Sequence, residues 1–308
     1  MGSNYSEICK CFHKIAKMKI LITGSSGFIG TNFIQNSSEF KIVEVDLLIQ
    51  KVEEVDFSGI DSVLHLAALV HQMKGAPEEQ YFKVNRDLAY EVSLKAKSQG
   101  VKQFVFMSTA KVFGESTTGK PAWNENSECK PQDAYGRSKY EAEKLLLGLQ
   151  DEHFKVAIVR SPLVYGVGVK ANMYNLVKLV NQCPVLPLGG INNVRSMVYV
   201  GNLVALLKHI IQTLAAGIFI AGDKQPLSTT RLTQLIATAS HKKIVLIRIP
   251  GFIRNLVKTV KPSIIDRLFG SLELDNASTN KKLGFIPPYS SEDGIHEMVE
   301  WYKTVSNI

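Results

Sequence analysis

The stretch that decides the fold is MKILITGSSGFIG, residues 18–30. It begins with a short run of aliphatic and β-branched residues and continues with glycines three residues apart, Gly24, Gly27 and Gly30, before an apolar helix start. A strand, a glycine-rich turn and a helix in this order form a dinucleotide-binding unit. The first glycine permits the tight turn, the second lets the backbone approach a pyrophosphate, and the third permits close packing of the helix. The residues expected at the phosphates, toward which the N–H groups of a helix start point, are Gly24, Gly27, Phe28, Ile29 and Gly30.

Short β-branched runs alternate with helical patterns along the first half of the chain. The expected strands are Lys19–Thr23, Lys41–Asp46, Ser62–Ala67, Gln103–Met107 and Val156–Arg160. The expected helices between them are Gly27–Gln35, Glu78–Gln99 and Ala134–Leu149. This alternation predicts the α/β class, with a Rossmann-like, doubly wound parallel sheet covered by helices on both faces.

The second half of the chain is less regular. After about Pro162 the expected strands are shorter and mix with helices, as in a smaller mixed α/β lobe that closes over a cleft. Those helices are Tyr174–Asn181, Asn202–Leu214 and Thr229–Ser240. We therefore divide the chain into an N-terminal extension (residues 1–17), a mainly dinucleotide-binding domain (18–165) and a C-terminal lobe that is mainly substrate-binding (166–308).

Composition excludes several classes of protein. With 45% hydrophobic and 21% charged residues among 308, the chain is expected to be globular, neither disordered nor fibrous. Polar residues interrupt every apolar run before the ~20 residues of a membrane span, so we expect a cytoplasmic protein without a transmembrane segment. The net charge of +8 would suit an anionic ligand, but no basic patch interleaved with aromatics predicts nucleic-acid binding. The four cysteines lack zinc-ligand spacing, so we expect reduced thiols and no metal site.

The second expected strand ends at Asp46, sixteen residues after Gly30. A carboxylate there can accept hydrogen bonds from the hydroxyls of an adenosine ribose and would repel a 2′-phosphate, which favours NAD over NADP. The alternative role for Asp46 is that of a strand-end turn former, and Glu44 lies two residues earlier. A further short strand is expected near Asp56 and Phe57, on the adenine side of the cofactor.

Tyr and Lys four residues apart on a helix share one face, so that the ammonium can stabilise a phenolate. The pattern occurs three times, at Tyr135/Lys139, Tyr140/Lys144 and Tyr174/Lys178. Only the first pair starts a helix beside the carboxyl ends of the strands, where the hydroxyls of Ser108 and Thr109 end the preceding strand. We therefore expect Tyr135 and Lys139 to be the functional pair. The alternative is that all three are amphipathic surface pairs.

Six motifs in a fixed order between residues 24 and 166 belong to a match that runs from Met18 to about residue 300, nearly the whole chain. They are GSSGFIG, HLAA at His65–Ala68, Asn85, MSTAKVFG at Met107–Gly114, YGRSK at Tyr135–Lys139 and RSPLVYG at Arg160–Gly166. Together they resemble the extended short-chain dehydrogenase/reductase family, whose NAD-dependent epimerase/dehydratase members act on nucleotide-sugars. The order of the motifs is far more specific than any one of them.

The resemblance implies a role for each matching residue. Thr109, Tyr135 and Lys139 would be catalytic, with Tyr135 as acid and base and Lys139 binding the nicotinamide ribose. Further cofactor-binding residues would be Asp46, Asp56, Phe57, Leu66, Ala67, Ala68, Asn85 and Pro162. Substrate-binding residues would be Ser108, Lys111, Asn172, Arg195 and Arg267, with Arg195 on the substrate pyrophosphate. The chain departs from the family pattern at Ser196 and Asn202, where acids are usual.

The same resemblance limits the reaction. In the dehydratases, Asp and Glu follow the catalytic threonine and eliminate water, whereas this chain has Ala110 and Lys111. The resemblance therefore implies NAD-dependent oxidoreduction at C4 of a UDP-sugar, most simply 4-epimerisation of a UDP-glucose or UDP-N-acetylhexosamine type of substrate. A lysine at position 111 also occurs in 4-reductases that use a UDP-4-keto-6-deoxy-N-acetylhexosamine, and this reading stays open.

A function of another class also stays open, that of a non-catalytic dinucleotide-binding regulator. Such proteins typically lose the Tyr or the Lys, and here Thr109, Tyr135 and Lys139 are all present. The resemblance further implies a homodimer that forms through the helices expected at Glu78–Gln99 and Ala134–Leu149.

Overall fold

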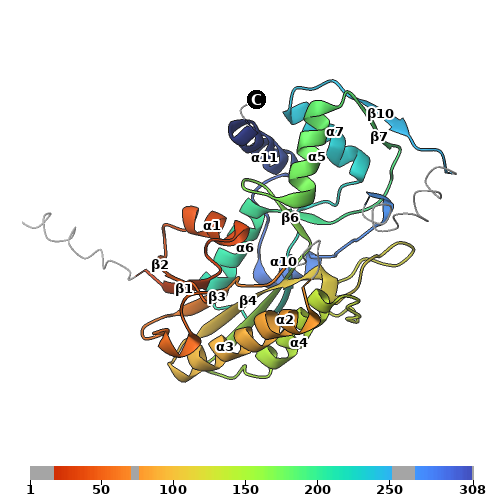
Figure 1. Cartoon of the computed structure of the whole chain (residues 1–308). Helices are drawn as coiled ribbons and strands as arrows, with labels where there is room; N and C mark the ends of the chain where they lie inside the picture. Colours follow the sequence, from red (N-terminus) through yellow and green to blue (C-terminus); the bar gives the residue numbers. More distant parts are fainter. Residues whose placement is uncertain (1–16, 71–75, 252–267, 307–308) are drawn as a thin grey trace, which may run out of the picture.

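The computed structural model describes residues 17–70, 76–251 and 268–306. Six parallel strands form one sheet in the order β2-β1-β3-β4-β5-β9 (Figure 1). They are β1 (Lys19–Thr23), β2 (Lys41–Val45), β3 (Ser62–His65), β4 (Gln103–Thr109), β5 (Lys155–Ser161) and β9 (Gly217–Ile220). Because β1 lies between β2 and β3, the direction of winding reverses there, as in a doubly wound Rossmann-like sheet. The expected fold class is confirmed.

Both faces of the sheet are buried, which explains the near-continuous apolar strands. Alternate residues of one strand enter different cores: in β1, Ile20 and Ile22 face one cluster and Leu21 faces the other. Helices α3 (Leu88–Ser98) and α4 (Ala134–Leu147) pack on the second cluster. Helices α1 (Phe28–Gln35) and α6 (Val200–Gln212) pack on the first, so the domain is a three-layer sandwich (Figure 1).

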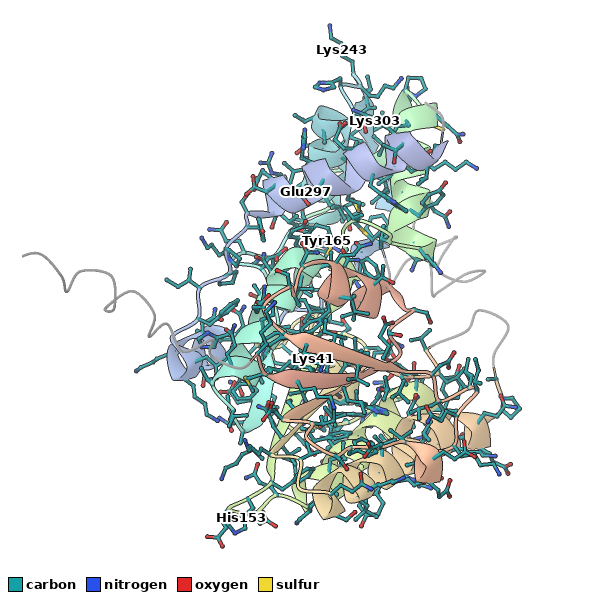
Figure 2. The ribbon with its side chains drawn as sticks, turned by 90° about the vertical axis from the view of Figure 1, so that its left-hand side faces the viewer. Lys41, His153, Tyr165, Lys243, Glu297 and Lys303 are labelled. Carbon is teal, nitrogen blue, oxygen red and sulfur yellow. The ribbon has the colours of Figure 1, made fainter. Side chains whose placement is uncertain are left out.

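The smaller lobe is built from two-stranded parallel sheets and helices. Its strands are β6 (Leu163–Tyr165), β7 (Val185–Gly189), β8 (Met197–Tyr199) and β10 (Val245–Arg248), paired as β6-β8 and β10-β7. Its helices are α5 (Ala171–Gln182), α7 (Thr229–Ala239) and α11 (Ser291–Ser306), while α10 (Ala277–Leu283) lies nearer the large sheet (Figure 1). Figure 2 shows Tyr165, which is fully buried, at the junction of the two parts.

After residue 165 the chain also contributes to the larger part, since β9 is an edge strand of the large sheet and α6 packs on one of its faces. Two details differ from the sequence-based expectations. The expected helix Glu78–Gln99 is α2 (Glu78–Phe82), a π-helical turn η3 (Lys83–Asp87) and α3. Asp56 and Phe57, both among the described residues, form no strand and follow a 3-10 turn, η2 (Val52–Glu54).

Gly24 makes the turn after β1 possible. Its φ is +71°, and a Cβ at this position would lie 2.6 Å from the backbone N of Ala67, in the loop that follows β3. Gly30 is restricted in a similar way, because its Cβ would lie 2.5 Å from the carbonyl oxygen of Gly24. Both contacts are with backbone, which cannot move aside as a flexible side chain can. The first and third glycines of the motif therefore let the turn, the helix α1 and the β3 loop meet.

Gly24→Ala should destabilise the protein by ~2–5 kcal/mol, because it combines a strained positive φ with a backbone clash. Gly59→Ala is the matched control: Gly59 has φ +68° but nothing within 4 Å of its Cβ position, so we expect ~1–2 kcal/mol from strain alone. Urea unfolding of both variants gives the difference. Equal losses would show that the close approach to the β3 loop does not constrain the fold.

Candidate active site

Several of the expected site residues lie at the carboxyl edge of the large sheet. The strand register places Thr23 beside Val45 and His65, so that Gly24, Asp46 and Leu66 follow at the same level. Thr109 ends β4 beside Ser161 of β5, which Pro162 follows. Ligands of open α/β sheets bind at this edge, next to the point where the winding reverses.

The turn after β1 has the features that a dinucleotide pyrophosphate needs. The first turn of α1, a helix that the structure describes in full, contains no acidic residue, so the positive end of its dipole is not neutralised. The β3 loop is held beside the turn because Leu66 N donates to Thr23 O (3.1 Å) and Ala67 N donates to Thr23 Oγ1 (3.3 Å). Ala68 continues this half-buried loop.

Asp46 is exposed at the end of β2, beside the glycine turn. Its Oδ1 accepts a hydrogen bond from Leu48 N at 2.9 Å, so the carboxylate is both a turn former and a surface group at the sheet edge. Together with the cradle at Gly24, this placement fits the adenosine end of NAD.

Tyr135 lies in the first turn of α4 and shares a hydrogen bond with Thr109 from the end of β4. Burial raises the pKa of Tyr135 to about 12, the hydrogen bond to Thr109 acts in the opposite direction, and the negative charge of Asp133 raises it further. The ring of Tyr81 from α2 meets that of Tyr135 edge-on, with ring centroids 6.5 Å apart. The hydroxyl pair therefore lies where a reacting oxygen at the sheet edge would meet it.

Lys139 follows one turn later on α4 and is only 1% exposed. Its ammonium donates to the carbonyl of Met107 (2.9 Å) and lies 4.3 Å from the centroid of the Phe106 ring. Burial lowers the pKa of Lys139 to about 7, although the nearby Glu143 raises it. A lysine so buried can change its protonation state near neutral pH.

Asn85 does not face the cofactor edge directly. It is fully buried in the π-helical turn η3. Its side-chain oxygen accepts a hydrogen bond from Leu69 N (2.8 Å), and its side-chain nitrogen donates to Leu69 O (3.0 Å). The same amide donates to Ser138 Oγ (3.0 Å), which donates to Tyr135 O (2.9 Å). Asn85 thus ties the β3 loop to the helix of Tyr135, and its donors are used within the protein. This corrects the expectation of a direct cofactor contact.

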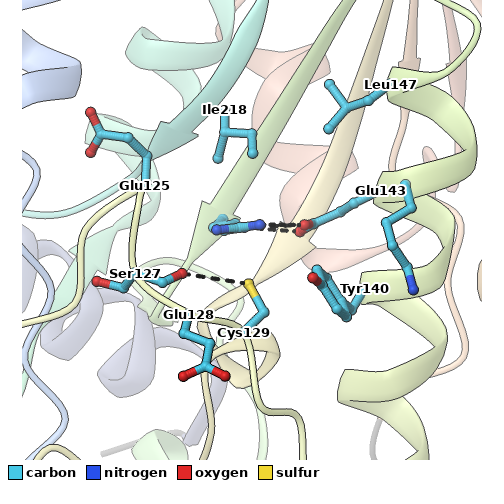
Figure 3. Close-up of a pocket in the computed structure, with 10 residues that line it drawn as sticks. Glu125, Ser127, Glu128, Cys129, Tyr140, Glu143, Leu147 and Ile218 are labelled. Carbon is cyan, nitrogen blue, oxygen red and sulfur yellow. Dashed lines mark hydrogen bonds and ion pairs between the residues drawn. The ribbon is translucent and has the colours of Figure 1, made fainter.

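Ser108 points into the protein and not toward a substrate. It is 3% exposed and donates to Glu143 of α4, which forms a bidentate ion pair with Arg160 of β5 (Figure 3). Glu143 and Arg160 are 1% and 3% exposed, and they line a cavity of about 450 Å³ behind α4 together with Tyr140. The substrate-binding expectation for Ser108 is therefore corrected: the side chain anchors α4 to the sheet.

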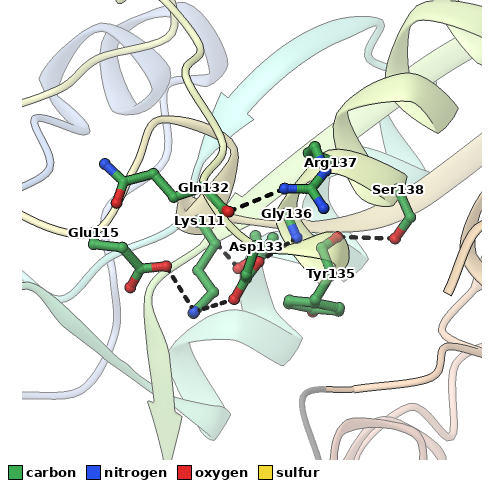
Figure 4. A network of polar contacts seen from close by, with 9 residues as sticks. Lys111, Glu115, Gln132, Asp133, Tyr135, Gly136, Arg137 and Ser138 are labelled. Atoms are coloured by element: carbon green, nitrogen blue, oxygen red, sulfur yellow. Dashed lines mark hydrogen bonds and ion pairs between the residues drawn. The ribbon is translucent and has the colours of Figure 1, made fainter. Parts of the chain in front are cut away.

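Lys111 also has its charge engaged within the protein. Its ammonium lies 2.5 Å from Asp133 Oδ2 and 3.0 Å from Glu115 Oε1 (Figure 4). Two carboxylates already satisfy this cation, which argues against the expected contact with substrate.

The second-lobe residues occupy different positions. Arg195 is half-buried and donates from Nη1 to Gly270 O (3.0 Å); burial lowers its pKa. Asn172 is exposed in the first turn of α5. Arg267 lies outside the described residues.

The two departures from the family pattern have structural explanations. Asn202 donates to Asp223 Oδ1 (2.7 Å). In this contact Asp223 supplies the carboxylate and position 202 supplies the donor. Asp223 also accepts from the hydroxyl of Tyr165 (2.7 Å). Ser196, the residue after Arg195, accepts a hydrogen bond at Oγ from Leu274 N (2.9 Å).

Two expected cofactor residues lie away from the site. Lys19, at the amino end of β1, donates from Nζ to the carbonyl of Ser58 (3.4 Å). Asp56 Oδ1 accepts from Ser58 N (2.9 Å), and Phe57 is buried in the core on the α3 side. Asp56 and Phe57 are therefore at the amino edge of the sheet, opposite Gly24, because the connection from β2 to β3 is short.

The other Tyr/Lys pairs do not reach the sheet edge beside Thr109. Tyr140 lines the cavity behind α4. Tyr174 belongs to α5 and packs against the rings of Trp301 and Tyr302 in α11.

Sequence reasoning missed three residues that position the site, namely Asp133, Glu143 and Arg160. Asp133 caps α4 by accepting from Gly136 N at 2.7 Å, and its place two residues before Tyr135 was the available signal. Glu143 lies four residues after Lys139, on the same helix face. The partner Arg160 is seventeen residues further on, and only the fold brings it to Glu143.

Within the described part of the chain, no group of three or more His, Cys, Asp or Glu side chains could hold a metal ion. No helix in that part is long and apolar enough to cross a membrane.

Comparisons with known proteins agree with this geometry. Residues 20–222 match the NAD dependent epimerase/dehydratase family. A UDP-glucose 4-epimerase of Vibrio cholerae is 33% identical, over 97% of this chain and 100% of that protein. An N-acetyl-α-D-glucosaminyl-diphospho-ditrans,octacis-undecaprenol 4-epimerase of Escherichia coli O157:H7 is 25% identical, over 92% of this chain and 94% of that one.

Solved structures show the same fold. A mutant UDP-glucuronic acid 4-epimerase of Bacillus cereus, in complex with NAD and a fluorinated UDP-sugar, has a TM-score of 0.73 at 19% identity, over 94% of this chain and 100% of that chain. RMD of Pseudomonas aeruginosa, complexed with NADPH, has a TM-score of 0.75 at 16% identity, over 93% and 99%. The family match, which covers about two thirds of the chain, and the long relative at 33% identity lead to one conclusion: the chain belongs to the NAD-dependent epimerase/dehydratase family of enzymes, which act on nucleotide-sugars.

Proposed function

We propose that this enzyme is a UDP-sugar 4-epimerase that uses NAD. The observation that carries the proposal is the pairing of Thr109, at the carboxyl end of β4, with Tyr135, in the first turn of α4, one helical turn before the buried Lys139. Two long relatives with 4-epimerase names, at 33% and 25% identity, support the same reaction.

Proton transfer at the C4 hydroxyl is the task of Tyr135. NAD, which the glycine turn at Gly24 and Asp46 would hold, would supply reversible hydride chemistry at C4, so that the configuration of this carbon can be inverted. Tyr135 takes the hydroxyl proton as the hydride leaves and gives it back as the hydride returns, so the overall reaction is an isomerisation. Thr109 holds the phenol through their hydrogen bond.

The pKa of Tyr135 must fall for it to act as a base near neutral pH, since burial holds it at about 12. Lys139, four residues later on the same helix face, is the cation that can do this. Its present partner is a neutral carbonyl, that of Met107, so the ammonium is not committed to an anion there.

Elimination of water from C5 and C6 needs further acid-base groups beside the catalytic hydroxyl. In the turn after Thr109, this chain has Ala110, and its Lys111 is paired with two carboxylates. The turn therefore favours chemistry confined to C4.

Reduction of a UDP-4-keto-6-deoxy-N-acetylhexosamine is the second candidate, because it would use the same Thr109, Tyr135 and Lys139. The two reactions differ in the cofactor: an epimerase regenerates it in each cycle, whereas a reductase consumes one reduced equivalent. Asp46, exposed beside the glycine turn, favours NAD and hence the epimerase.

The substrate class we propose is a sugar 1-diphosphate, with UDP-glucose and UDP-N-acetylhexosamines first. Mixing the enzyme with a panel of UDP-sugars, without added reductant, should give the C4 epimer of at least one of them. Product that forms only when NADH or NADPH is added, with one equivalent consumed, would identify the reductase instead.

We expect tighter binding of NAD than of NADP, because the Asp46 carboxylate would meet the 2′-phosphate at short range. Titration of both cofactors into Asp46→Ala should show that this discrimination is lost. Glu44→Ala, an exposed acid on the same strand, is the matched control and should keep it. Tighter NADP binding by the unmodified enzyme would contradict this assignment.

Arg195→Ala should weaken the binding of UDP by roughly one to two decades, as expected for the loss of a charged hydrogen bond of ~1.5–3 kcal/mol, and leave NAD binding intact. Calorimetry with UDP measures this, because UDP carries the phosphates without the sugar. Arg231→Ala removes an exposed arginine that pairs with Glu292 on the same lobe and should have no effect. Unchanged UDP affinity in Arg195→Ala would show that Arg195 has a structural role, through its hydrogen bond to the carbonyl of Gly270.

Tyr135→Phe should lower turnover by ~10²–10⁴-fold while UDP-sugar affinity is retained, because only the proton-transferring oxygen is lost. Tyr140→Phe and Tyr174→Phe remove the same atom from the other two Tyr/Lys pairs and should be mild. Steady-state kinetics of the three variants would contradict the choice of pair if Tyr135→Phe retained near-normal turnover.

A further inference from the structure

Lys111 contacts both the strand end that carries Thr109 and the helix start that carries Tyr135. It lies in the turn η4 (Ala110–Val112) directly after Thr109, and its backbone N donates to Thr109 Oγ1 at 3.3 Å. Its ammonium reaches across to Asp133 Oδ2 at 2.5 Å (Figure 4). One residue thus touches the catalytic threonine with its backbone and the cap of the catalytic helix with its side chain.

Asp133 is the residue that starts α4. Its Oδ1 accepts from Gly136 N at 2.7 Å, and its carbonyl accepts from Arg137 N at 3.0 Å. Tyr135 lies in the sequence between Asp133 and these two residues, so both hydrogen bonds span it. The helix start also packs tightly on the turn, because a Cβ on Gly136 would lie 2.8 Å from the carbonyl oxygen of Lys111.

We propose that Lys111 is a positioning residue for the reaction, which fixes Tyr135 against Thr109 by joining the turn after β4 to the cap of α4 and by balancing the charge of Asp133. The inference rests on the proposed function only in taking Tyr135 as the group that transfers the proton. It replaces the expected contact of Lys111 with substrate.

The charges around Tyr135 make this role measurable. Asp133 acts on it from the start of its own helix, Thr109 from β4 and Tyr81 from α2, while Lys111 reaches it only through Asp133. Lys139 lies one turn further along the helix, with its ammonium on the carbonyl of Met107. The Asp133 carboxylate raises the pKa of Tyr135. Burial acts to lower the pKa of Lys111, but hydrogen bonds to Asp133 and Glu115 raise it overall, so the ammonium stays charged beside that carboxylate.

Removing the charge of Lys111 and removing the charge of Asp133 should therefore shift the pKa of Tyr135 in opposite directions. Lys111→Met removes a positive charge beside Asp133, which raises the pKa of Tyr135. Asp133→Asn removes the negative charge, which lowers that pKa, and the amide oxygen can still accept from Gly136 N. We expect the pKa of Tyr135 to shift by about one unit in each direction, as for the loss of a single nearby charge that is partly exposed to solvent.

The experiment measures kcat/KM against pH for the UDP-sugar reaction in the NAD-loaded enzyme. Activity that needs the phenolate rises as pH passes the pKa of Tyr135. The rise should move to higher pH in Lys111→Met and to lower pH in Asp133→Asn, and should return near its original position in the double variant. Lys111→Arg should restore the profile, and Glu115→Gln, which removes the more exposed partner, should change it little.

A merely structural role would lower kcat in both single variants and move neither profile. Unshifted profiles, or shifts of the same sign, would overturn the proposal. Melting temperatures of all variants separate loss of folding from loss of positioning, and Asp133→Asn and Lys111→Arg keep the test valid if Lys111→Met does not fold.

A second readout does not depend on turnover. Ultraviolet titration of tyrosinate in each variant, minus the same variant with Tyr135→Phe, gives the midpoint of Tyr135 directly. Opposite shifts in this titration, in an enzyme that converts no UDP-sugar, would retain the positioning role and reject the proposed function. Normal UDP-sugar turnover with unshifted midpoints would reject the positioning role and retain the proposed function.

Discussion

The close backbone contact between the turn after β1 and the loop after β3 is the constraint on which the site depends. Gly24 satisfies it with a positive φ and no side chain, and Thr23 holds the β3 loop through its carbonyl and its hydroxyl. Because the strands are parallel and in register, this contact also fixes the level of Asp46 and of the end of β4. The glycine turn, Asp46 and Thr109 therefore lie along one edge of the sheet.

Buried polar groups then attach the catalytic helix to that edge. Asn85 joins the β3 loop to Ser138, and the pair of Glu143 and Arg160 joins α4 to β5 from the other side. A buried ion pair of this kind tolerates poorly the loss of one partner, since the other is left charged and unpaired. Lys139 works in the same buried layer, where burial brings its pKa to about 7. The helix that carries Tyr135 is thus held at several points before any ligand binds.

Much of this could be predicted from the sequence, because it depends on local patterns. The alternation of strands and helices predicted the sheet, and Thr109 and Tyr135 lie at the strand end and helix start where they were expected. The sequence could not reveal that Ser108 and Asn85 turn inward, since their partners, Glu143 and Leu69, are distant along the chain. Asp56 and Phe57 were misplaced for a related reason: the short β2–β3 connection moves them to the amino edge. The strand β9 was missed because GIFI is short and lies far from the other strands in sequence.

In the proposed epimerisation, the hydride that leaves C4 of the UDP-sugar returns to the same carbon without exchange of the cofactor. This can be measured by converting a UDP-sugar deuterated at C4 in the presence of free unlabelled NADH. We expect an epimer at C4 that retains the deuterium on that carbon. Loss of the deuterium to the free cofactor, or a product that has gained hydride from NADH, would contradict it.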